Sequence, residues 1–207
     1  MYKGLDSIGP WKSMGTSRGV ELYYATVSGS RYEAFKGVMK LRADLRPLVA
    51  MFQDTQNMPK WMYSTKSVEV LDQISPVESI RYLINEIPYP LMQDRDVVVH
   101  TRLTQHDDGS VAIRMTKKEG IKPDISGKVR IPRLDTLVNF FPKSDGEIEI
   151  EYLGHIEPGG VILSKVYNLM LKDTPLETMK DFRDQLKSYQ SKNYDHLTYI
   201  QPVEAFA

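Results

Sequence analysis

The chain has 207 residues, of which 41% are hydrophobic and 26% charged, as in an ordinary soluble globular protein. Its 27 basic residues balance 27 acidic ones, so no net charge attracts a polyanion and nucleic acid is not expected as a partner. The absence of cysteine excludes disulfides, thiolate catalysis and cysteine-bound metals.

No segment reaches the roughly 18 to 20 consecutive apolar residues of a membrane-spanning helix. The first residues, MYKGLDSIGPWK, lack the apolar stretch of a signal peptide. An exported mature domain placed behind Met1 would look the same, so the sequence leaves open whether the protein is cytoplasmic or periplasmic. At this length we expect a single domain over 1–207, with a core at about 11–188 and an irregular tail at 192–207.

The first part of the chain reads as strands followed by one short helix. After a short element around Trp11, residues 19–27 and 31–41 have strand composition, and the small polar residues 28–30 predict a hairpin between them. Apolar residues at helical spacing then predict a helix over 44–54. Pro47 falls in its first turn, where proline is tolerated.

The middle of the chain is a succession of strands. Six β-rich segments follow one another at 66–74, 77–87, 96–105, 110–118, 133–142 and 147–156. The sequences HDDG at 106–109 and KSDGE at 143–147 predict turns, because their glycines can take positive φ.

The C-terminal part predicts a long helix in two pieces, 160–171 and 175–188, that meet near Asp173. Thr174 to Glu177 has the pattern of a capping box, with Pro175 at the first helical position. The tail after residue 191 is expected to be irregular and on the surface. Strands, a short helix, more strands and a final helix predict an α+β fold, with a strongly curved antiparallel sheet around the last helix.

Sequence patterns that carry chemistry are mostly missing. No glycine-rich phosphate loop, nucleophile elbow or zinc-binding histidine spacing occurs, so neither a cofactor nor a metal is expected. His100 is either a partly exposed strand residue or a general base in a cavity. The cluster Asp94-Arg95-Asp96 is either a surface turn or an ion-pair node that fixes the entry of the next strand.

Two segments resemble a known family. The stretch PYPLMQDRDVVV at 88–99 is similar to the Pro-Trp-Pro…Arg-Asp-Phe-Val segment of the START family, the StAR-related lipid-transfer domains. The stretch EPGGVILSKVYNLMLKDTPLETMKDFRDQL, beginning at Glu157, resembles the Asp-Pro-Gly-Gly entry to that family's C-terminal helix. In order and spacing the resemblance covers Trp11 to Ser188.

The resemblance implies a helix-grip fold, in which a curved antiparallel sheet wraps around a long, kinked C-terminal helix over a hydrophobic cavity. Members shelter one lipid or sterol-like molecule and usually lack catalytic groups. Carried over to this chain, Pro158, Gly159 and Gly160 would form the hinge at the helix entry. Arg95 and Asp96 would be the Arg-Asp pair that opens an inner strand.

The resemblance also implies where the chain departs from its relatives. Steroid-binding members place an acid and an arginine in the tunnel wall, and counting without gaps from Arg95 puts Tyr82 and Thr101 at those positions. The tunnel would then recognise its ligand through hydroxyl groups or by shape alone, which argues against cholesterol.

The cavity lining is expected from inward alternation on the strands and from the apolar face of the last helix, although each residue could equally be plain core. Ten methionines and twelve tyrosines suit either role. The predicted lining consists of Tyr82, Ile84, Val97, Val99, Thr101, Ile113, Met115, Ile162, Val166, Leu169, Met170 and Met179.

The expected function is non-enzymatic binding, and transfer between membranes, of a lipid or another hydrophobic molecule by a monomer that touches membrane surfaces transiently. The alternative is a helix-grip enzyme of the cyclase or aromatase kind, which would need His100 or Tyr82 in the cavity with a polar partner. A ligand-sensing interaction protein is a third hypothesis, neither favoured nor excluded by the sequence.

Overall fold

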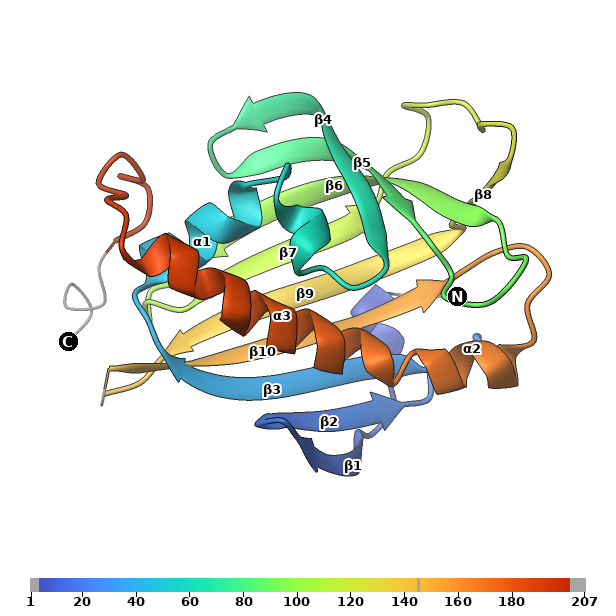
Figure 1. Ribbon diagram of the computed structural model, residues 1–207, viewed down its shortest axis with the longest axis horizontal. Coiled ribbons are helices and arrows are strands. Elements are labelled where there is room, and N and C mark those ends of the chain that lie inside the picture. Colours follow the sequence, from blue (N-terminus) through green and yellow to red (C-terminus); the bar gives the residue numbers. More distant parts are fainter. Residues whose placement is uncertain (1–3, 145, 202–207) are drawn as a thin grey trace.

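The computed structural model describes residues 4–144 and 146–201, and these form a strongly curved antiparallel sheet around a C-terminal helix (Figure 1). Along the sheet the strand order is β1-β2-β3-β10-β9-β7-β6-β5-β4, with β8 parallel beside β6. The strands are β1 (Lys12–Ser17), β2 (Val20–Ala25), β3 (Ala34–Arg42), β4 (Thr65–Ser75), β5 (Glu78–Asn85), β6 (Asp94–Gln105), β7 (Val111–Lys117), β8 (Lys128–Arg130), β9 (Arg133–Pro142) and β10 (Glu147–Glu157).

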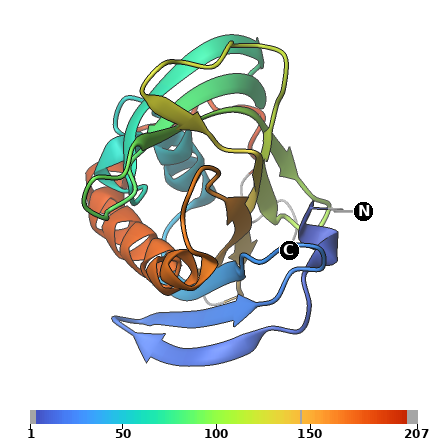
Figure 2. The same ribbon diagram turned by 90° about the vertical axis from the view of Figure 1, so that its right-hand side faces the viewer.

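Three α-helices lie on the concave side of this sheet: α1 (Leu45–Gln53), α2 (Ser164–Met170) and α3 (Asp173–Gln190). Short 3₁₀ turns occur at Gly4–Ser7 and Met58–Lys60. Seen from the end of the molecule, the sheet curls around α3 (Figure 2). The predicted α+β architecture, a curved sheet clasping a broken C-terminal helix, is confirmed.

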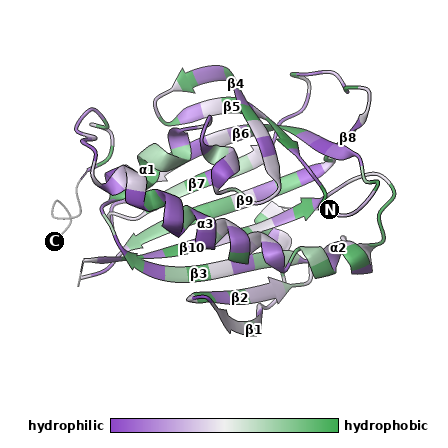
Figure 3. Cartoon of the chain, in the orientation of Figure 1, coloured by the Kyte–Doolittle hydropathy of each residue, from purple (hydrophilic) through white to green (hydrophobic). Residues whose placement is uncertain are grey.

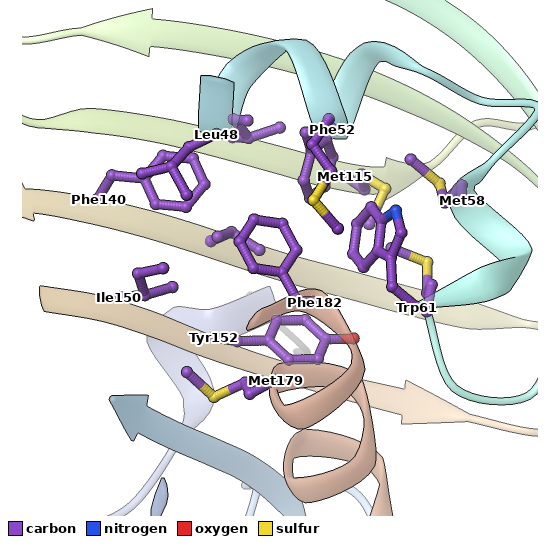
Figure 4. Close-up of a cluster of buried hydrophobic side chains, with 14 of the residues drawn as sticks. Leu48, Phe52, Met58, Trp61, Met115, Phe140, Ile150, Tyr152, Met179 and Phe182 are labelled. Carbon is purple, nitrogen blue, oxygen red and sulfur yellow. The ribbon is translucent and has the colours of Figure 1, made fainter. Parts of the chain in front are cut away.

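The core lies between the sheet and α3. The outer face of α3 is polar (Figure 3), and its inner face buries Met179, Phe182 and Leu186. Aromatic rings join the layers, because Phe182 lies 5.0 Å from the Trp61 ring centroid and 6.3 Å from that of Phe140 (Figure 4). Helix propensity alone does not hold α3 in place; burial of this face does.

The entry to the C-terminal helix differs from the prediction. The first piece begins at Ser164 instead of residue 160, because Gly159 and Gly160 have φ of +67° and +64° and residues 161–163 continue as a loop. The predicted capping box at Thr174 is also wrong. Lys172 occupies the N-cap of α3 with helical φ and ψ and no side-chain cap, so Thr174 already lies inside the helix. The break near Asp173 is confirmed.

Two strands were not predicted, β1 and the three-residue β8, and the tail is placed differently from the expectation. Residues 192–201 are irregular, as predicted, but they are not confined to the surface, since Ile200 is fully buried. The Arg46 Nε atom donates to the Ile200 carbonyl at 3.2 Å, and Tyr199 Oη donates to Gln53 Oε1 at 2.7 Å, so this segment packs on α1. Residues 202–207 of the predicted tail, and residue 145 of the predicted turn at 143–147, lie outside the described residues.

Candidate ligand-binding site

A cavity of about 90 Å³ lies where the ends of β5, β9 and β10 meet α2 and the loop between β10 and α2. Figure 2 looks onto this end of the molecule. The walls are mainly apolar, and the polar exceptions include the Thr136 hydroxyl, which is buried without a hydrogen-bond partner among the described residues. The lining comprises Met62, Tyr63, Ser64, Thr65, Leu83, Asn85, Glu86, Ile87, Pro88, Arg95, Met115, Ile131, Leu134, Thr136, Tyr152, Ile156, Pro158, Tyr167, Met170, Leu171 and Thr174.

Arg95 ties the loop after β10 across the cavity. Its side chain is only 2% exposed and lies on the inner face of β6. The Arg95 Nε atom donates to the Pro158 carbonyl at 3.2 Å, Nη2 donates to the Gly159 carbonyl at 3.3 Å, and Nη1 donates to the Gln93 carbonyl. Burial lowers the pKa of Arg95, and these three hydrogen bonds all go to backbone carbonyls. Arg95 therefore acts as a latch for this loop.

The geometry of the loop favours glycine at positions 159 and 160. A Cβ atom on Gly159 would lie 2.9 Å from the Arg130 carbonyl oxygen, and one on Gly160 would lie 3.2 Å from Val129 Cγ1. Both residues also have positive φ, which disfavours any side chain. At position 159 the clash is with backbone, whereas at position 160 it is with the Val129 side chain, so a change at Val129 can relieve it.

Replacing Gly159 by alanine is expected to lower the free energy of unfolding by about 2–3 kcal/mol, because left-handed strain adds to a clash with backbone. Gly120 is the matched control, since its φ is +77° but a Cβ there would meet open space. Gly120→Ala should cost only about 1 kcal/mol. Urea denaturation of both variants measures the difference, and equal losses would contradict the close approach.

The structure brings only some of the predicted lining residues to the cavity. Met115 and Met170 line it, together with Arg95 and Pro158 from the predicted hinge. Val97, Val99 and Ile162 are buried in the main core without lining the cavity. Thr101 and Ile113 face the same side of the sheet but line a different pocket at its other end.

The prediction that Tyr82 and Ile84 face the interior is wrong. In the β5–β6 register, Arg81 pairs with Val99 and Leu83 with Val97 on the inner face, so Tyr82 and Ile84 lie on the outer face. There they join a small apolar cluster with Ile80, Val98, Leu71 and Ile125. The segment that carries Ile125 covers this part of the outer face, so the side chains there are apolar too. Because β5 is apolar on both faces, its sequence does not show which face is inner.

Three predicted helix residues are also placed elsewhere. Leu169 is exposed and Val166 only half-buried, because α2 is short and turns this side outward. Met179 is buried, but it lines a separate void of about 20 Å³ beneath α3.

Asp96, the second residue of the predicted Arg-Asp pair, forms an ion-pair node on the outer face. Arg130 Nε and Nη2 donate to its two carboxylate oxygens at 3.0 Å each, and Tyr82 Oη donates to Oδ2 at 2.9 Å. Burial alone would raise the pKa of Asp96, but the hydrogen bonds from Arg130 and Tyr82 outweigh it and lower the pKa below 3.8. The node joins β5, β6 and β8 at the point where β6 begins, as the ion-pair interpretation of this cluster expected.

Replacing Asp96 by asparagine is expected to cost about 2–3 kcal/mol of unfolding free energy at pH 7, because it leaves Arg130 without its carboxylate. Since the folded-state pKa of Asp96 is lowered, its contribution is complete above the unfolded pKa of about 3.9 and is lost as the pH falls through the folded value. The gap between variant and wild type should therefore narrow below pH 4 in urea titrations. A gap that does not change with pH would contradict this role, and the exposed Asp107→Asn serves as control.

His100 lies on the outer face of β6, as the non-catalytic interpretation expected. It pairs across the strands with Ile80, and its Nε2 atom lies 2.6 Å from Glu78 Oε1. Neither His100 nor Tyr82 lines the cavity.

The cavity residues that the prediction missed come from residues 62–65, from the end of β5 and the connection after it, and from β9, β10 and α2. Leu134, Thr136 and Tyr152 are examples, and the strict alternation of EIEIEY at 147–152 was the signal that could have located Tyr152. Ile87 and Pro88 lie in an irregular connection that carries no such period.

Comparison with known proteins identifies the family. The START domain model matches residues 5–192. The chain belongs to the START domain family. A relative, an uncharacterised protein of Pseudomonas aeruginosa, is 31% identical over 173 residues, which cover 84% of this chain and 85% of that protein.

Solved START domain structures agree with the fold. The STAR-related lipid transfer protein of Xanthomonas axonopodis is 30% identical, with a TM-score of 0.79 over 86% of this chain and 99% of that one. Human StAR-related lipid transfer protein 5 reaches the same TM-score of 0.79 at 15% identity, over 86% of this chain and 87% of that one, and supports the fold alone. Within the described part of this START domain, no helix has the length and apolar character needed to cross a bilayer.

Proposed function

We propose that this START domain binds a lipid or another hydrophobic small molecule in the cavity behind the Arg95 latch and exchanges it at a membrane surface. The observation that carries the proposal is an apolar cavity closed by a loop whose outer side exposes large apolar residues. Family membership, and the similarity to a bacterial STAR-related lipid transfer protein, support the same reading.

The size of the cavity implies that binding requires opening. A volume of about 90 Å³ is well below the roughly 300–1,000 Å³ of pockets that enclose ligands of drug size. Three methionines, Met62, Met115 and Met170, line the cavity, and their unbranched side chains can repack around a guest. Each buried methylene of an acyl chain then contributes about 0.8 kcal/mol, which offsets the cost of displacing the loop.

The membrane-facing surface is defined as the exposed apolar residues Leu91, Val161, Leu163 and Leu169. Leu91 is fully exposed and has a φ of +64°, a backbone conformation that is strained for leucine. The segments that carry these residues continue directly from Pro88, Pro158 and Met170 in the cavity wall. Apolar side chains around a cavity entrance suit insertion into the interfacial region of a bilayer.

Carriage is favoured over catalysis by the placement of the groups that the enzyme alternative needs. His100 and Tyr82 lie on the outer face of the sheet, where they bond to Glu78 and Asp96. The cavity polar groups, such as the Thr136 hydroxyl, can orient a ligand oxygen, and we propose no reaction for them.

The test is the recovery of a bound molecule from purified protein by native mass spectrometry, followed by organic extraction. We expect wild-type protein to carry an apolar molecule, and Thr136→Phe, which fills the cavity from β9, to carry at least tenfold less. Thr104→Phe, on the exposed side of β6, is the control and should match wild type. Full occupancy in a folded Thr136→Phe variant would contradict the proposed site.

A further inference from the structure

A second pocket lies at the opposite end of the sheet from the cavity behind the Arg95 latch. It has a volume of about 620 Å³ and is lined by residues from the end of α1, the β4–β5 turn and positions 196–199. Its floor is the inner face of β5, β6 and β7, through Arg81, Thr101 and Ile113. Nothing in the proposed lipid carriage uses this pocket.

Arg81 is a buried cation without a carboxylate partner among the described residues. Its side chain is 5% exposed, its Nε atom donates to Ser79 Oγ at 2.9 Å, and Nη1 donates to the Phe52 carbonyl at 3.2 Å. By contrast, Arg114 and Arg130 make close ion pairs with Asp135 and Asp96. Burial lowers the pKa of Arg81 to about 10, so the guanidinium is still charged at neutral pH.

Thr101 adds a second unsatisfied polar group to the same floor. Its Oγ1 atom is buried and has no hydrogen-bond partner among residues 4–144 and 146–201. Thr101 pairs with Ser79 across the strands, and Arg81 pairs with Val99, so Arg81 and Thr101 are diagonal neighbours on one face. A guanidinium fork beside a hydroxyl is a donor set that matches an oxyanion.

The other walls of the pocket indicate the character of the rest of the ligand. Val77, Leu103, Ile113 and Leu197 provide apolar surface next to the floor. Glu78 is also in the lining, but its carboxylate is on the outer face of the sheet, 2.6 Å from His100 Nε2, and does not pair with Arg81. Burying a charge without a counter-ion is costly unless a ligand supplies the opposite charge, and perturbed buried groups in pockets mark candidate binding sites.

We propose that this pocket is a second ligand site, which binds an amphipathic oxyanion with its carboxylate or phosphate group on Arg81 and Thr101 and its apolar body against Val77, Leu103 and Leu197. The bidentate geometry of arginine suits either head group. The two pockets share none of their lining residues, although they adjoin where Thr101 pairs across the strands with Met115 of the first cavity.

The test is calorimetric titration with decanoate, decyl phosphate and the neutral control decanol, performed in the Thr136→Phe background so that the first cavity is filled. We expect decanoate or decyl phosphate to bind at least tenfold more tightly than decanol, and the tighter of the two identifies the head group. Arg81→Gln should weaken anion binding at least tenfold and leave decanol unchanged, whereas Thr101→Val should weaken it about threefold. The exposed Arg102→Gln, on β6, controls for net charge and should have no effect.

A second measurement separates binding from a purely structural role of Arg81. If Arg81 serves a ligand, Arg81→Met removes an uncompensated buried charge and should leave Tm unchanged or raised, while Arg81→Lys retains part of the anion affinity. A lower Tm for Arg81→Met, together with anion affinity within twofold of the Thr136→Phe parent for Arg81→Gln, would overturn the proposal. Equal affinity of the Thr136→Phe parent for decanol and both anions would overturn it as well.

Discussion

Phe182→Ala is expected to lower the free energy of unfolding by about 3–5 kcal/mol. The Phe182 ring is buried between α3 and the sheet, where it packs edge-on against Trp61 at 5.0 Å and stacks on Phe140 at 6.3 Å (Figure 4). Its removal leaves a hole that surrounding strands cannot close without breaking their ladders. Urea denaturation followed by tryptophan fluorescence measures the loss, since Trp61 reports directly on this contact.

Tyr89→Ala is the matched control, because this aromatic residue is about half exposed in the connection between β5 and β6. It should change stability by no more than about 0.5 kcal/mol. A Phe182→Ala loss below about 1.5 kcal/mol would mean that the ring is not in a well-packed core.

The double variant Leu91→Asp/Leu163→Asp is expected to slow ligand transfer between vesicles by more than tenfold. Both side chains belong to the proposed membrane-facing surface, and carboxylates in their place would have to enter the apolar side of the interface. Binding of a fluorescent fatty acid in the absence of vesicles should stay within twofold of wild type, because neither residue lines the cavity. Stopped-flow transfer between donor and acceptor vesicles measures the rate.

The control for this double variant is Val70→Asp/Ile74→Asp, which places the same charges on two exposed apolar residues of β4. This pair lies outside the proposed membrane-facing surface and should transfer ligand at the wild-type rate. Equal slowing by both double variants would show that added charge, and not the position of the surface, governs transfer.

Hydrophobic periodicity predicted the α+β order of elements, but it did not decide which face of each strand is inner. On β6, Val97 and Val99 were placed correctly on the inner face, whereas Val98 between them is equally buried on the outer face. On β5 the same ambiguity led to the wrong choice of Tyr82. A strand that is covered on both sides carries no alternation, and the cover over the outer face comes from an irregular segment without a sequence signature.

The start of the C-terminal helix could not be predicted for a different physical reason. The motif Glu157-Pro158-Gly159-Gly160 indicated a tight turn, and both glycines adopt positive φ. The number of further residues before a helix can start depends on contacts with β8, which is only three residues long and had no strand signal of its own. The exposure of Leu169 follows from that delayed start.

The lone charge of Arg81 could not be inferred from the sequence. An arginine in an apolar strand usually lies at the solvent face or next to an acid, and the sequence shows neither the face nor the partner. Its lack of a carboxylate among the described residues follows from how α1 and β5 come together.

The most direct test that the cavity opens at the loop after β10 is to cross-link this loop in its closed position. The chain has no cysteine, and a Cβ atom at position 160 would lie 3.2 Å and 3.5 Å from the two Cγ atoms of Val129, so Val129→Cys/Gly160→Cys places a thiol pair within disulfide reach. We predict that the oxidised variant takes up a fluorescent fatty acid at least tenfold more slowly than the same protein after reduction. Uptake at the same rate in both redox states would contradict a cavity that opens at this loop.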